Sequence, residues 1–191
     1  MSIVLCPGFH DSVLTNSFVS RLHKLISEKT SKFNSVEILM PLSENILILS
    51  SYHIVSFLKE KLGNNLDTPL VFISFSAGVV GAIGASHLWQ SQGGNVKALI
   101  AIDGWGVPLL GSFPIHRMSH DYFTHWSSLL LGGGKNNFYA QPSVSHLELW
   151  RSPDLVKGLW VDLDTHSEYT SSCVSATEFL YEILKDYNQI F

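Results

Sequence analysis

The sequence predicts an α/β fold, a three-layer sandwich built on a mostly parallel sheet of about six strands. Two observations predict it. Short apolar runs rich in β-branched residues alternate along the chain with longer segments whose apolar residues recur at helical spacing. The mean hydropathy of +0.19 is high for a soluble domain, which indicates either strands buried on both faces or an exposed apolar site. Because each crossover between parallel strands must cover one face of the sheet, the alternation favours helices on both faces.

The first half of the chain supplies three strands and two helices. Residues 2–8 read as a strand that is ended by Pro7 and Gly8, and the apolar spacing of 12–30 predicts a helix with its basic residues late. The run 35–41 is a strand stopped by Pro41, and 44–63 holds a helix that ends at glycine. The run 68–75 is the third strand.

The second half continues the same alternation, with one interruption. A helix is expected over 77–91, strands over 95–104, 136–142 and 158–164, and an amphipathic helix over 175–187. The interruption is 104–135, a long excursion rich in glycine and aromatic residues. We interpret 1–191 as a single domain, and because long excursions in compact domains are often functional, this one is a candidate lid or pocket wall.

Composition excludes several classes of function. The net charge of −4 and the pI near 6.1 give no reason to expect nucleic acid or an anionic membrane surface as a partner. No apolar run approaches the roughly 18–20 residues that a membrane helix needs, so no stable membrane insertion is expected. The N-terminus lacks a basic region, and the two cysteines, Cys6 and Cys173, suggest no disulfide framework. A cytoplasmic location is therefore the expectation, and the oligomeric state is left open.

Ser76 follows directly on the apolar run 68–75, where a strand would hand over to a helix. Ligands of parallel sheets bind beyond the carboxyl ends of the strands, so a serine at this place is well sited to act as a nucleophile. The sharp turn that would project it needs small residues two positions either side, and these are Ser74 and Gly78. The N–H of Ala77 could then face an oxyanion. The plain alternative is a serine that caps the helix.

The segment "SFSAG" (74–78) resembles the nucleophile elbow G-x-S-x-G of the α/β-hydrolase superfamily, with Ser74 in place of the first glycine. Among its members, the small lidless serine esterases and lipases are the most similar. The resemblance implies a minimal α/β-hydrolase fold. It further implies a serine hydrolase that cleaves a carboxylic ester or thioester through an acyl-enzyme, with no cofactor and no metal. The alternative is a catalytically inactive member of the same fold that binds a partner.

The resemblance also implies the residues that assist Ser76. The loop "PGFH" (7–10) stands where the family supplies its second oxyanion donor, which would be the Phe9 N–H, and His10 could touch substrate. The family places its general base in a loop after the last strand, which selects His166, with His146 as the main rival. The plain alternative for residues 7–10 is a turn that ends a strand, and for His166 it is a surface histidine.

A serine hydrolase also needs a carboxylate that orients the histidine. Asp103 ends the expected fourth strand, where it could reach the cleft, and Glu148 and Asp164 are the alternatives. The plain alternative is an aspartate that caps a turn. Trp105 leaves the same sheet edge and is a candidate for the substrate pocket.

Histidines gather in "HRMSHDYFTH" (116–125), within the excursion. His116 and His120 are four residues apart, which would place them on one face of a helix, with Asp121 and His125 nearby. Imidazole and carboxylate both ligate zinc, but the segment has no H-E-x-x-H spacing and no cysteine pair. We therefore interpret it as a polar helix face rather than a metal site.

Overall fold

A computed structural model describes residues 1–29, 36–41, 45–63, 65–162 and 172–188. These residues form one mixed, mostly parallel sheet of eight strands with six α-helices and one short 3₁₀ helix. The strands are β1 (Ser2–Cys6), β2 (Glu37–Leu39), β3 (Leu70–Phe75), β4 (Val96–Ile102), β5 (Ile115–Ser119), β6 (Asn136–Ala140), β7 (Lys157–Asp162) and β8 (Ser172–Ser175). The helices are α1 (Ser12–Lys29), η1 (Asn45–Leu49), α2 (Ser51–Leu62), α3 (Gly78–Ser91), α4 (Tyr122–Leu129), α5 (His146–Arg151) and α6 (Ala176–Asn188).

The strand order places the carboxyl ends of four neighbouring strands side by side. The order across the sheet is β2-β1-β3-β4-β5-β6-β7-β8, and the pairings from β2 through to β6 are all parallel. The β6–β7 and β7–β8 pairings are antiparallel. Parallel strands bring their carboxyl ends to one edge of the sheet, so the residues that follow β3, β4, β5 and β6 are brought to the same edge.

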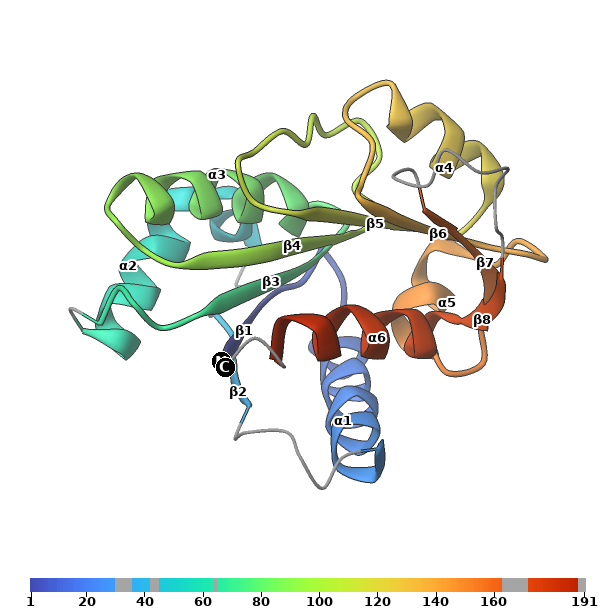
Figure 1. Cartoon of the computed structure of the whole chain (residues 1–191), viewed down its shortest axis with the longest axis horizontal. Coiled ribbons are helices and arrows are strands. Elements are labelled where there is room, and N and C mark those ends of the chain that lie inside the picture. Colours follow the sequence, from blue (N-terminus) through green and yellow to red (C-terminus); the bar gives the residue numbers. More distant parts are fainter. Residues whose placement is uncertain (30–35, 42–44, 64, 163–171, 189–191) are drawn as a thin grey trace.

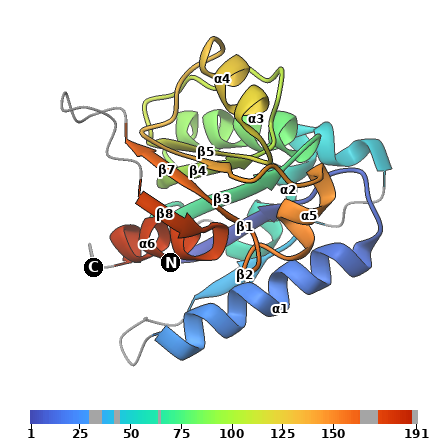
Figure 2. The same cartoon turned by 90° about the vertical axis from the view of Figure 1, so that its right-hand side faces the viewer.

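Helices cover both faces of the sheet, which gives the expected three layers (Figures 1 and 2). Alternate residues of β1 show how the two cores divide: Ile3 and Leu5 belong to one apolar cluster, and Val4 and Cys6 to the other. The first cluster takes its helical side chains from α1, α5 and α6, and the second from η1, α2 and α3. Since both faces of the central strands are buried, they read as continuous apolar runs rather than alternating ones.

Two strands lie where the sequence indicates none, so the sheet exceeds the predicted count of about six. β5 lies within the excursion 104–135, and its sequence, IHRMS, carries little β-branched apolar signal. Burial of Arg117 there is possible because its guanidinium donates to the backbone carbonyls of Val107, Leu131 and Gly132. β8 is four residues long and holds two serines. Local strand propensity does not predict β5 or β8, because both strands form through pairing with their neighbours in the sheet.

No helix in the described part of the chain has both the length and the apolar character required to cross a bilayer.

His116 is a buried residue of β5, and the fold holds it in the neutral form. Its Nε2 lies 2.8 Å from the Tyr187 hydroxyl of α6, and 1% of the residue is exposed. Burial, with a smaller contribution from the charge of Lys135, lowers the pKa of His116 from 6.5 to about 4. Near pH 6, His116 therefore binds a proton in the unfolded chain but stays neutral in the folded chain.

We expect the free energy of unfolding to fall as the pH drops from 6.5 towards 4, because proton uptake by His116 then favours the unfolded chain. Between pH 7 and pH 5 this one group should cost about 2 kcal/mol. Urea unfolding of the wild type and of His116→Gln at both pH values measures the effect, and the variant should lack that part of the pH dependence. An identical pH dependence in the two proteins would contradict a buried neutral imidazole.

Candidate active site

Ser76 occupies a sharp turn between β3 and α3. Its φ is 52°, in the left-handed region that side chains other than glycine rarely adopt, and its N–H donates to the Ile102 carbonyl of β4 at 2.9 Å. Such backbone strain costs on the order of 1–3 kcal/mol and persists only where the surroundings enforce it. A strained strand-to-helix turn is the conformation that exposes a serine Oγ at the top of a parallel sheet.

The close packing around this turn explains the small residues that flank it. A Cβ added at Gly78 would lie 2.3 Å from the backbone oxygens of both Cys6 and Pro7. A Cβ added at Gly8 would lie 2.9 Å from the Ser76 Cβ. The loop after β1 therefore packs directly against the turn after β3, because glycine at both positions lets the two backbones approach.

Two backbone N–H groups near Ser76 are candidates for an oxyanion hole. Phe9 lies in the loop that packs on the turn, and Ala77 follows Ser76 at the start of α3. Within the described residues, neither N–H donates a hydrogen bond, and no side chain caps α3. Both groups are thus free to bind a negatively charged oxygen, which the helix dipole of α3 would also favour.

Asp103 is the hub of the polar site. It follows β4 with a φ of 51°, and its side chain is 1% exposed. Oδ1 accepts the His120 backbone N–H at 2.9 Å, and Oδ2 accepts from Nδ1 of His120 at 3.0 Å and from Nδ1 of His146 at 2.9 Å. Burial alone would raise the pKa of Asp103, but the hydrogen bonds from the two histidines and the charge of His120 bring it below the ordinary value. The carboxylate is therefore held ionised.

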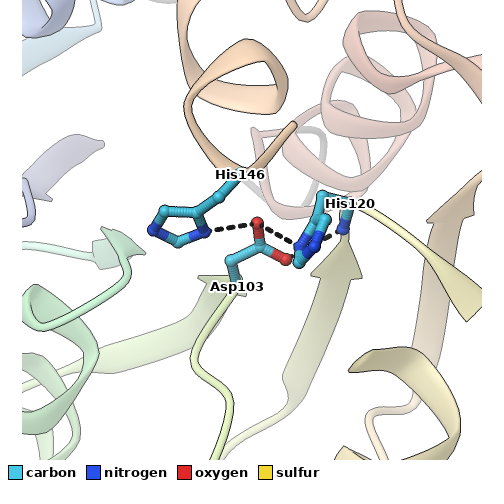
Figure 3. A group of neighbouring side chains, drawn as sticks. All are labelled: Asp103, His120 and His146. Carbon is cyan, nitrogen blue, oxygen red and sulfur yellow. Dashed lines mark hydrogen bonds and ion pairs between the residues drawn. The ribbon is translucent and has the colours of Figure 1, made fainter. Parts of the chain in front are cut away.

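The two imidazoles lie on opposite sides of this carboxylate, as Figure 3 shows. His146 begins α5, and its ring stacks on Phe75, the neighbour of Ser76, with 4.7 Å between ring centroids. Its Nδ1 faces Asp103, while its Nε2 has no hydrogen-bond partner among the described residues. This arrangement leaves Nε2 available to accept a proton.

His120 is placed differently, because both of its ring nitrogens face carboxylates. Nδ1 bonds to Asp103, and Nε2 lies 3.5 Å from Oδ2 of Asp121. The hydrogen bond to Asp103 raises the pKa of His120, against the opposing effect of burial. Of the two imidazoles, His146 is the one with a nitrogen free to serve as a base.

Ser76 and the Asp103–His146 pair line the same cavity. Its volume is about 310 Å³, and its lining is formed by Ser76, Ala77, Val80, Asp103, Trp105, Val107, His120, Thr124 and His146. Trp105, a predicted pocket residue, donates its Nε1–H to the Ser127 hydroxyl of α4 and stays 62% exposed. The excursion thus contributes a wall to the cavity.

His10 lies outside this cavity lining, although it is close to the site. Its ring stacks on Phe75 with 5.4 Å between centroids, on a residue whose ring also contacts His146. Burial, and then the charge of His146, lowers the pKa of His10. His10 therefore contacts the site only through Phe75 among these rings, and its contact with substrate stays a prediction.

The other residues predicted as base or carboxylate are His166, Asp164 and Glu148. His166 and Asp164 lie outside the described residues, so their parts stay predictions. Glu148 pairs with Arg151 at 3.5 Å rather than with a histidine.

The expectation that His116 and His120 share a helix face is wrong. His116 belongs to β5, and His120 follows its end. The histidine at 120 reaches Asp103 because the unpredicted strand carries it there.

No family model matches the sequence, and no curated protein is detectably similar to it.

Proposed function

We propose that the protein is a serine hydrolase that cleaves a carboxylic ester or thioester through an acyl-enzyme intermediate. The observation that carries the proposal is the strained Ser76 turn, which lines one cavity together with a buried, ionised aspartate and the imidazole bonded to it. The chain order Ser76, Asp103, His146 agrees with the order of nucleophile, acid and base in α/β hydrolases.

In the proposed reaction, Ser76 Oγ attacks the carbonyl carbon of the substrate while Nε2 of His146 accepts the hydroxyl proton. Asp103 holds the Nδ1–H tautomer and stabilises the imidazolium that forms. The Phe9 and Ala77 N–H groups bind the oxyanion. His146 then returns the proton to the departing alcohol or thiol, and a water activated in the same way releases the acid and restores Ser76.

The cavity lining supports an uncharged acyl group as substrate. Val80, Trp105 and Val107 supply its apolar wall, and no lysine or arginine is among the described residues that line it. A charged acyl group would lose hydration there without gaining a partner.

The test is the time course of p-nitrophenyl ester hydrolysis at high protein concentration. An acyl-enzyme predicts a burst of p-nitrophenol close to one equivalent per chain, followed by slower turnover. Ser76→Ala should abolish the burst, while Ser74→Ala, a buried serine whose hydroxyl donates to Ile100, serves as the matched serine variant. Folded wild-type protein without burst or turnover over a panel of esters and thioesters would favour a binding protein of the same fold.

A further inference from the structure

Asp103, His120 and His146 together have the composition of a metal centre, in addition to containing the proposed catalytic pair. One carboxylate oxygen of Asp103 and one ring nitrogen from each of His120 and His146 all lie within 4.8 Å of one another. From this grouping we propose that the three side chains form a binding site for a divalent zinc ion, and that an ion bound there blocks the hydrolase.

The ligand set and its spacing suit zinc. Two imidazoles and one carboxylate are ligands that zinc commonly takes, at about 2.0–2.2 Å, with water in the fourth position. Tetrahedral geometry at those lengths separates ligand atoms by about 3.3 Å. The Nδ1–Oδ2 distances of 3.0 and 2.9 Å need to open by only a few tenths of an ångström, and the two rings must turn towards each other.

The surroundings favour an ion at this place. The three residues follow the adjacent parallel strands β4, β5 and β6, so the sheet fixes their spacing. The Asp103 carboxylate is 1% exposed, whereas the side chains of His120 and His146 are 25% and 41% exposed. An ion can therefore reach, from the cavity that all three residues line, a charge that water screens weakly.

The blocking effect follows from where the imidazole protons must go, and it rests on the proposed function. A bound ion takes the lone pair of Nδ1, so the proton that the neutral His146 ring carries on Nδ1 moves to Nε2. A protonated His120 ring instead releases its Nδ1 proton to solvent and keeps the one on Nε2. With Nε2 of His146 protonated, the ring can no longer accept the proton of Ser76, and acylation stops.

Isothermal titration of the EDTA-treated, desalted protein with ZnCl₂ in a non-chelating buffer tests the site without reference to activity. We expect one ion per chain, with affinity weakened at least about tenfold in both His120→Asn and His146→Asn, since even residues that only orient a ligand are worth about 10–100-fold. His23→Asn, an exposed histidine of α1, is the matched control and should bind as the wild type does. Absent binding, or equal affinity in all four proteins, would overturn the site.

Two measurements on the wild type guard against variants that fail to fold. Titration with CoCl₂ should give the intense visible bands of a four-coordinate ion, and weak six-coordinate bands would contradict the proposed geometry. Equimolar zinc should also remove the p-nitrophenol burst, and EDTA should restore it. Tight zinc binding with an undiminished burst would refute the block alone, whereas a missing burst in zinc-free protein would instead refute the proposed hydrolase.

Discussion

Replacing His146 with alanine is expected to lower kcat/KM for ester hydrolysis by at least about 10⁴-fold, because the Ser76 proton then has no acceptor. His146 is the imidazole that bonds to the buried Asp103 through Nδ1 and leaves Nε2 without a partner among the described residues. Its ring also stacks on Phe75, next to Ser76. Steady-state kinetics with a p-nitrophenyl ester measure the loss, with thermal unfolding to establish that the variant folds.

The same assay applied to His166→Ala separates the two candidate bases. His166 follows the last expected strand, where the family resemblance places the base, but it lies outside the described residues. A much larger loss in His146→Ala than in His166→Ala is the result expected from the contacts of Asp103. The reverse order would reassign the base to His166, and His23→Ala controls for the loss of an exposed histidine.

Replacing Asp103 with asparagine should lower kcat/KM by about 10⁴-fold, through the tautomer of His146 rather than through its position. The asparagine Oδ1 can still accept the His120 backbone N–H, as the aspartate does now. Its amide group would then face two Nδ1–H donors where Oδ2 now accepts both. To avoid opposed donors, both rings must move their protons to Nε2, which deprives Ser76 of its base.

Asp121→Asn is the matched control for this variant. Asp121 accepts the Thr124 N–H at the start of α4, and asparagine caps helices equally well. We expect its kcat/KM to stay within about tenfold of the wild type. Comparable losses in the two variants would indicate that charge near His120, rather than the Asp103 acceptor, determines activity.

The layered fold is predictable from the sequence because most strands are buried on both faces. The runs ending at Cys6, Phe75 and Ile102 are continuous and apolar, and the structure has a strand at each. The run of β5 carries polar residues that tertiary contacts satisfy, as the carbonyls around Arg117 show. The short run of β8 forms a strand through its pairing with β7. Sequence patterns do not register such contacts, so these strands were not predicted.

The candidate site also combines residues that are predictable from the sequence with residues that are not. The turn at Ser76 is predictable because its small neighbours are a local signal, and Asp103 because it ends an obvious strand. Contacts of His120 and His146 with Asp103 are non-local: they depend on the order of β4, β5 and β6 across the sheet. His120 directly follows β5, so the strand Ile115–Ser119 is what brings it to the edge of the sheet that holds Ser76 and Asp103.

Reaction with a fluorophosphonate, followed by intact-mass and peptide mass spectrometry, tests most directly whether Ser76 is an activated nucleophile. We expect one adduct per chain, located on Ser76, formed rapidly in the wild type and at least about 10³-fold more slowly in His146→Ala. Well-folded wild-type protein that remains unmodified under excess reagent, or that carries its adduct on another serine, would contradict the assignment of Ser76 as the nucleophile.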